Sequence, residues 1–174
     1  MRQDRNMPRF LSCLIIATGL FYGSFAAANT SQVYDDDAAP KFPMTFYDMN
    51  VTQPETMRDF LSVINATYDL MIDKGVPVRR IKFVVSLRGF SVKIASDPYL
   101  DGLEDTVLAE AIRTQLDGLK SRGIRIEACL ISCNWMGVPV EDMVDGIVII
   151  DNAFAASTFY QRKGYALVPI HQLP

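Results

Sequence analysis

Two cysteines four residues apart, Cys129 and Cys133, are the side chains of this sequence whose type and spacing could support a reaction; they lie in the stretch RIEACLISCNWMGV. A cysteine thiolate is a nucleophile and can carry a second sulfur atom as a persulfide. One helical turn between the two residues would bring their Cα atoms to about 6 Å, within reach of a disulfide. Free cysteine is also among the most buried residue types. A reactive sulfur site, a disulfide and a pair of small apolar core residues are therefore the three interpretations.

The first 28 residues have the pattern of a secretory signal peptide. A basic start is followed by an apolar run at 10–25 and by three alanines at 26–28, which suit a cleavage site. The run of 16 residues is shorter than the ~20 residues that a bilayer-spanning helix needs. We therefore predict an exported protein, periplasmic or secreted, with no membrane segment after cleavage. Cys13 is lost with the signal peptide, so the mature chain keeps only the pair described above.

The charge of the mature chain limits the partners that it can bind. Residues 29–174 carry 14 basic and 19 acidic side chains, a formal charge of −5, which argues against nucleic acid or an anionic membrane as a partner. Residues 29–43 are polar, acidic and interrupted by prolines, which predicts a flexible leader in which Asp35–Asp37 are solvated carboxylates. Residues 44–174 are enough for a single domain with a substantial core.

Apolar runs alternate with segments of helical periodicity through this domain. Five apolar or β-branched runs predict strands at 44–51, 81–87, 124–130, 145–151 and 165–170. Four segments between them predict helices at 52–75, 103–121, 131–137 and 152–164, the third no longer than two turns. Residues 89–102 read as irregular. The alternation predicts an α/β fold, a three-layer α/β/α sandwich with a five-stranded, mostly parallel sheet.

Two helices carry more detailed expectations. Thr52 is a candidate N-cap for the first helix, Pro54 suits its first turn, and Glu55 stands three residues after Thr52 as in a capping box. In the second helix, the three- and four-residue spacing places Val107 and Leu108 on the inward face.

The predicted fold gives the two cysteines different positions. Functional groups of an open parallel sheet gather just beyond the carboxyl ends of its strands, and Cys129 stands at the end of the strand IRIEAC. The start of the next short helix offers unpaired N–H groups and a partial positive charge, and both favour thiolate over thiol. Cys129 is therefore the better candidate nucleophile, and burial is the competing interpretation of both cysteines.

Other common sites find little support in the sequence. The single histidine, His171, is four residues from the C-terminus, where we expect a solvated side chain. A zinc site made of this histidine and two cysteines lacks a fourth strong ligand, and a Cys–His hydrolase would need the same histidine as its base. No glycine-rich phosphate loop occurs. We therefore predict neither a metal nor a cofactor.

Most of the mature chain resembles the DsrE/DsrF-like sulfur-relay family, especially its exported members. The resemblance rests on KFVVSLRG, GIRIEAC, GVPVEDM and QRKGYALVPI, in this order and spacing, and it covers residues 51–170. It implies a five-stranded parallel sandwich and assembly into trimers or hexamers. Sulfur-carrying members have a cysteine eight residues before a glycine, as Cys129 stands before Gly137. Many relatives have a histidine where this chain has Arg88, just before Gly89.

The resemblance implies a function for the cysteine pair. Cys129 would accept and pass on sulfane sulfur, with Cys133 as a resolving partner, and Arg88, Gly89 or nearby backbone N–H groups would bind and stabilise the thiolate. The partners would be a sulfur donor or acceptor protein and further copies of the chain. Relay members act in the cytosol, so an exported member needs a different donor. The alternatives are a non-catalytic oligomeric module that binds a small molecule or protein, with buried cysteines, and a thiol–disulfide oxidoreductase.

Overall fold

The computed structural model describes residues 43–172, so the predicted signal peptide and nearly all of the predicted leader lie outside it. The strands are β1 (Met44–Asn50), β2 (Lys82–Leu87), β3 (Arg125–Cys129), β4 (Val148–Ile150) and β5 (Ala166–His171). The helices are α1 (Pro54–Asp73), α2 (Ser91–Ile94), α3 (Asp97–Asp101), α4 (Thr106–Ser121), α5 (Leu130–Met136) and α6 (Ala153–Arg162). Single 3-10 turns occur at Val78–Arg80 and Val140–Asp142.

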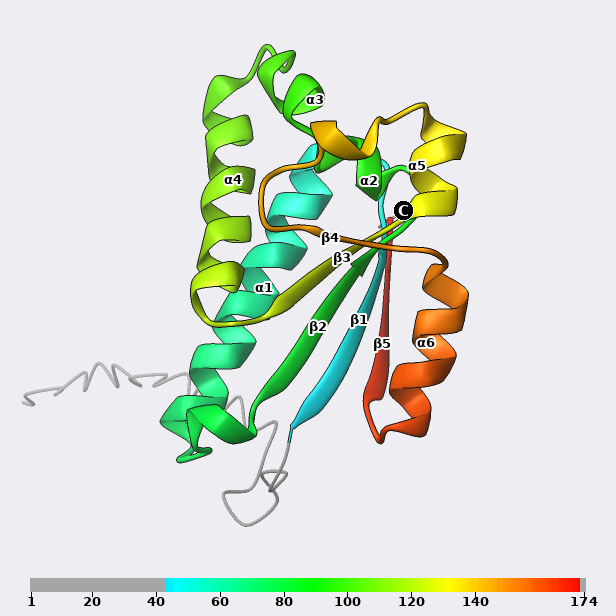
Figure 1. Ribbon diagram of the computed structural model, residues 1–174. Coiled ribbons are helices and arrows are strands. Elements are labelled where there is room, and N and C mark those ends of the chain that lie inside the picture. The colour runs from blue at the N-terminus through cyan, green and yellow to red at the C-terminus, as the bar shows by residue number, and fades with distance from the viewer. Residues whose placement is uncertain (1–42, 173–174) are drawn as a thin grey trace, which may run out of the picture. The chain divides into compact units, whose positions relative to one another are not determined.

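The five strands form one sheet in the order β4-β3-β2-β1-β5, and every neighbouring pair is parallel. Helices α1 and α4 cover one face, α6 covers the other, and α2, α3 and α5 gather near the carboxyl ends of the strands (Figure 1). The α/β fold class predicted from the alternating pattern is therefore confirmed, with a sheet that is entirely parallel.

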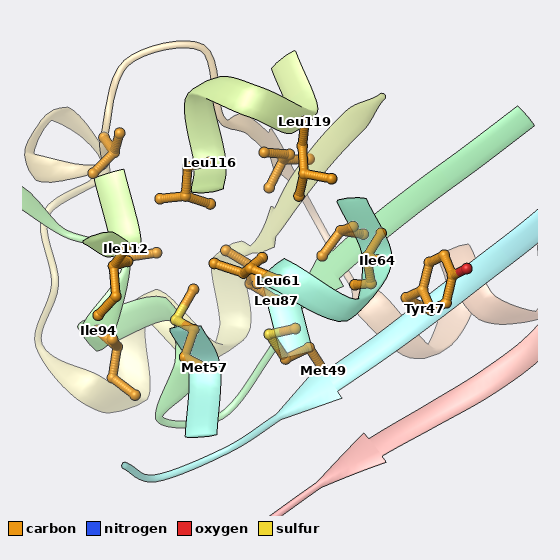
Figure 2. Packing of buried hydrophobic residues seen from close by; sticks show 14 of the residues in the cluster. Tyr47, Met49, Met57, Leu61, Ile64, Leu87, Ile94, Ile112, Leu116 and Leu119 are labelled. Carbon is orange, nitrogen blue, oxygen red and sulfur yellow. The ribbon is translucent and has the colours of Figure 1, made fainter. Parts of the chain in front are cut away.

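The main hydrophobic core lies between the sheet and the pair α1 and α4. Alternate side chains of β1, such as Tyr47 and Met49, meet Leu61 of α1 and Leu116 of α4 in this layer (Figure 2). Met49, Leu61 and Leu116 are fully buried, and burying each such side chain contributes roughly 1.5–3 kcal/mol. This apolar layer holds the sheet against the helix pair.

The opposite face of the sheet, under α6, is partly polar. Phe46 of β1 stacks on Tyr160 of α6 with ring centroids 5.0 Å apart, which identifies the residues of β1 that face α6. In the strand register Asp48 pairs with Ser86, and Ser86 pairs with Glu127. Three polar side chains therefore form a row across β1, β2 and β3 beneath this helix.

The start of α1 differs from the sequence prediction. The N-cap residue is Gln53, its side chain makes no capping hydrogen bond, and Thr52 instead binds the Gln172 side chain through its N–H at 3.0 Å and its hydroxyl at 3.2 Å. Pro54 occupies the first turn as predicted. A contact with the far end of the chain thus replaces the predicted capping box, and local spacing could not reveal it.

Helix α4 also starts later than predicted. Asp105 caps it by accepting a hydrogen bond from the Leu108 N–H at 2.9 Å, so the helix begins at Thr106. Val107 then points outward and is 78% exposed, which makes the prediction of an inward side chain wrong, whereas Leu108 is buried. First-turn side chains lie at the rim of the packed layer, where periodicity alone does not decide their burial.

Two short helices, α2 and α3, occupy the segment that was predicted to be irregular. Each has five residues or fewer, too short for helical periodicity to be visible. None of the helices within residues 43–172 is long and apolar enough to cross a membrane.

Candidate functional site

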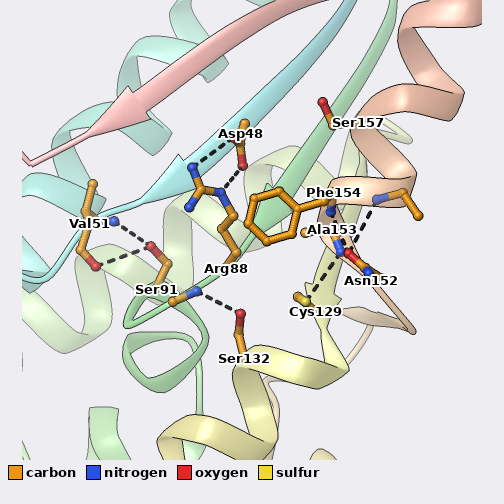
Figure 3. Close-up of polar contacts among 12 residues, drawn as sticks. Asp48, Val51, Arg88, Ser91, Cys129, Ser132, Asn152, Ala153, Phe154 and Ser157 are labelled. Carbon is orange, nitrogen blue, oxygen red and sulfur yellow. Dashed lines mark hydrogen bonds and ion pairs between the residues drawn. The ribbon is translucent and has the colours of Figure 1, made fainter.

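Cys129 is the last residue of β3 and directly precedes α5, and it is only 2% exposed. Its Sγ accepts a hydrogen bond from the backbone N–H of Ala153 at 3.4 Å (Figure 3). Ala153 is the first residue of α6. The thiol therefore lies at the carboxyl end of the sheet, between the first turns of two helices.

The start of α6 has a free N–H for this sulfur because of how it is capped. The Asn152 side chain accepts hydrogen bonds from the N–H groups of Phe154 at 2.8 Å and Ala155 at 3.4 Å. N–H groups in the first turn of a helix have no intrahelical partner. Asn152 thus satisfies the second and third of them, and the N–H of Ala153 donates to Cys129.

The surroundings separate the two cysteines electrostatically. Burial raises the pKa of the Cys129 thiol, but hydrogen bonds from the N–H groups of Ala153, Ser132 and Ile131 and from the Ser132 hydroxyl outweigh it, so the pKa lies below its ordinary value. Burial raises the pKa of Cys133, and the neighbouring Cys129 raises it further. Cys129 is accordingly the cysteine that forms a thiolate more readily.

Ser132 and Gly89 connect this thiol to the end of β2. The Ser132 hydroxyl accepts a hydrogen bond from the Gly89 N–H at 2.9 Å. Gly89 has a φ of +57°, and a Cβ there would overlap the Asn50 Oδ1 atom. The glycine at the end of the predicted strand is thus required by a left-handed backbone and a close approach, and its N–H positions the hydroxyl that contacts Cys129.

Arg88 lies near the site with its charge already compensated. Its guanidinium donates to both carboxylate oxygens of Asp48, at 2.6 and 3.1 Å, and its centre lies 5.6 Å from the ring of Phe154 (Figure 3). The groups that donate hydrogen bonds to Cys129 are backbone N–H groups and the Ser132 hydroxyl. Of the predicted thiolate-stabilising groups, the backbone N–H groups contact the sulfur.

Cys133 belongs to a different layer of the molecule. It has no exposed surface and joins the hydrophobic core cluster that includes Met57 and Leu87. Both described cysteines are free thiols. The two predicted site residues are neighbours in the sequence, but the packing gives Cys129 polar surroundings and Cys133 apolar ones.

Sequence reasoning missed a buried carboxylate below the thiol. Glu127 is two residues before Cys129 on β3 and 2% exposed; its Oε1 accepts from Arg125 Nε at 2.6 Å and from the Tyr160 hydroxyl at 2.7 Å. Its Oε2 atom and the Ser86 hydroxyl are buried without a partner in the described part of the chain. The alternation of strand side chains could have placed Glu127 on the face of Cys129, whereas its partners depend on packing.

Replacing Ser132 with alanine is expected to raise the pKa of Cys129, because the thiolate loses the hydrogen bond from the hydroxyl. The measurement is a pH titration of thiolate ultraviolet absorbance in a chain in which Cys129 is the sole cysteine (Cys13→Ser, Cys133→Ala). The matched control is Ser96→Ala, which removes another buried serine whose hydroxyl donates to the Lys93 carbonyl. An unchanged titration in Ser132→Ala contradicts the assignment of this hydrogen bond.

Comparison with solved structures supports the fold. The chain is similar to a protein of unknown function, MTH1491, from Methanobacterium thermoautotrophicum, with 16% identity, 74% of this chain and 98% of that chain covered, and a TM-score of 0.53. It is also similar to the ychN protein of E. coli, with 12% identity, coverage of 75% and 99%, and a TM-score of 0.52.

No family model and no curated protein matches the sequence. No group of three or more potential metal-ligating side chains occurs within residues 43–172. At these identities the solved structures establish a shared α/β architecture and no activity, so function must be argued from the site.

Proposed function

We propose that the chain is an exported, DsrE-like sulfur carrier that holds sulfane sulfur as a persulfide on Cys129. The observation that carries the proposal is the Cys129 thiol at the carboxyl end of the sheet. It accepts hydrogen bonds from N–H groups in the first turns of α5 and α6, and its pKa is lowered. The sequence resemblance and the architecture shared with ychN support it. The same donors that favour the thiolate also favour an anionic persulfide.

The transfer step needs no external oxidant or reductant. The Cys129 thiolate attacks the outer sulfur of a donor R–S–SH, a new S–S bond forms on Cys129, and the donor leaves as R–S⁻. The resulting Cys129–S–SH can pass its outer sulfur to an acceptor thiolate in the same way. Alternatively, Cys133 as a thiolate attacks the inner sulfur, which forms a Cys129–Cys133 disulfide and releases HS⁻. The raised pKa of Cys133 makes this second route slow at neutral pH.

Incubation with inorganic polysulfide, followed by intact mass measurement, is expected to add sulfur in steps of about 32 Da to the wild-type chain. Cys129→Ser should lose this adduct and Cys133→Ser should keep it, since Cys129 has the lower thiol pKa. Treatment with a thiol reductant should remove the adduct. Equal loading of Cys129→Ser and wild type would sink the assignment.

The burial of both cysteines favours a second candidate function, a non-catalytic module that binds a small molecule or a protein. Cys129 is 2% exposed and Cys133 has no exposed surface. If the chain is such a module, a small alkylating reagent should label no thiol without denaturant. Polysulfide should then leave no sulfur adduct. The carrier predicts that one thiol, Cys129, is labelled in the native protein, so counting labelled thiols separates the two.

We also propose that the exported chain assembles into trimers or hexamers. Large apolar side chains are exposed on the helices beside the site: Trp135 on α5 at 73%, and Phe154 and Phe159 on α6 at 65% and 51%. A second copy of the chain would bury these side chains. Light scattering during size-exclusion chromatography should therefore give a mass three or six times that of the monomer, and a monomer contradicts the proposal.

A further inference from the structure

A cavity of about 390 Å³ opens at the end of the sheet opposite to Cys129. Its wall includes the first residues of β2, and Arg125, the first residue of β3, whereas Cys129 is the last residue of that strand. Tyr160 and Tyr165, from the end of α6 and the turn after it, complete the wall. A volume of this size lies within the range of small-molecule sites.

The charges in this wall are of one sign. Among the lining residues within 43–172 none is acidic, and four are cationic: Arg79, Lys82, Arg122 and Arg125. Arg122 pairs with Asp69 at 2.9 Å, and Arg125 pairs with Glu127 at 2.6 Å. Arg79 and Lys82 make no ion pair with any residue of the described range 43–172. Within the described residues the cavity therefore has two cations without an acidic partner, in a chain whose net charge is negative.

Four aromatic side chains also line the cavity, together with aliphatic ones. The rings of Tyr68 and Phe83 meet edge to face with centroids 5.9 Å apart, and those of Tyr160 and Tyr165 lie 4.9 Å apart. Burial, and then the charge of Glu127, raise the pKa of Tyr165, so its phenol stays protonated and can donate a hydrogen bond to an anion. Aromatic side chains beside unpaired cations suit a ligand with a flat apolar body and an anionic group.

We propose that this cavity binds a small aromatic oxyanion, in which Arg79 and Lys82 hold the carboxylate, phosphate or sulfate group and the aromatic wall contacts the ring. Guanidinium groups match the geometry of such oxyanions. The site is separate from Cys129 and does not depend on the proposed sulfur chemistry.

The test is a titration of the full chain with phenyl phosphate, followed by amide NMR. The expected result is saturable shifts at Ile81, Gly123 and Ile124, which line the cavity, with a dissociation constant on the order of 1 mM or lower. Phenol, which lacks the anion, and inorganic phosphate, which lacks the ring, should each bind at least about tenfold more weakly. Added salt should weaken the binding of phenyl phosphate.

The variants identify the cations that hold the anion. Arg79→Gln/Lys82→Gln should weaken phenyl phosphate binding by about tenfold or more, and the fold should persist because both side chains are exposed. Lys93→Gln, which removes a cation from a different cavity, is the matched control and should bind as the wild type does. Unchanged affinity in the double variant, equal binding of phenol, or shifts confined to other parts of the chain would overturn the proposal.

Discussion

Gly89→Ala is expected to destabilise the protein by about 2–4 kcal/mol, measured by urea unfolding at neutral pH. Two causes add. An alanine pays a conformational cost at a φ of +57°, and its Cβ would overlap Asn50 Oδ1 and lie 3.1 Å from Asn50 Cγ. Any part of the overlap that is relieved by a shift of the backbone at residue 89, rather than by rotation of the Asn50 side chain, also moves the residue 89 N–H away from the Ser132 hydroxyl and raises the pKa of Cys129.

Gly137→Ala is the matched control for this experiment. Gly137 has a similar φ of +64°, but a Cβ there has no neighbour within 4 Å, so only the backbone cost of about 1 kcal/mol is expected. In the double variant Gly89→Ala/Asn50→Ala the overlap is removed, and its stability should approach that of Gly137→Ala. Equal losses in Gly89→Ala and Gly137→Ala would show that the close approach to Asn50 contributes nothing.

Tyr160→Phe is expected to lower the free energy of unfolding by about 2 kcal/mol, because the buried Glu127 carboxylate loses a hydrogen bond of 2.7 Å. Arg125→Met removes the other donor to the same oxygen and should lower the free energy of unfolding by about 2–3 kcal/mol. This is less than the loss for a fully buried ion pair, because the Arg125 side chain is 48% exposed. Tyr165→Phe is the control. The Tyr165 hydroxyl makes no hydrogen bond to Glu127, so Tyr165→Phe should lower the free energy of unfolding only slightly.

A double-mutant cycle tests whether the carboxylate is the cause. In a Glu127→Gln background the uncharged amide needs fewer donors, so Tyr160→Phe should cost clearly less than in the wild type. Identical costs in both backgrounds would refute the role given to Glu127.

The same tyrosine predicts a dependence of stability on pH. Burial, and then the hydrogen bond to Glu127, raise the pKa of Tyr160 from 10.0 to about 12. Since the unfolded chain ionises first, the stabilisation is complete below pH 10 and is lost as the pH rises towards about 12. The loss should be about 1–2 kcal/mol after allowance for solvent screening, and Tyr160→Phe should lack this part of the slope.

Local patterns in the sequence were sufficient for the order and type of the main elements. The alternation of apolar strands with amphipathic segments follows from the burial of one face of each element. The apolar or polar type of each residue indicates on which face it lies. The predictions failed where burial depends on neighbours that are distant in the chain. Val107 lies at the rim of its layer, and Thr52 binds Gln172 at the far end of the domain.

The sequence by itself determined that Cys129 stands at the end of a buried strand and directly before a short helix. Only the tertiary structure decided what surrounds the sulfur. The N–H of Ala153 reaches Cys129 across 24 residues, and Arg88 pairs with Asp48 across 40, because the parallel register brings the carboxyl ends of the strands together. Such pairings carry no periodic signal, since they depend on how whole elements pack rather than on the spacing of residues within one of them.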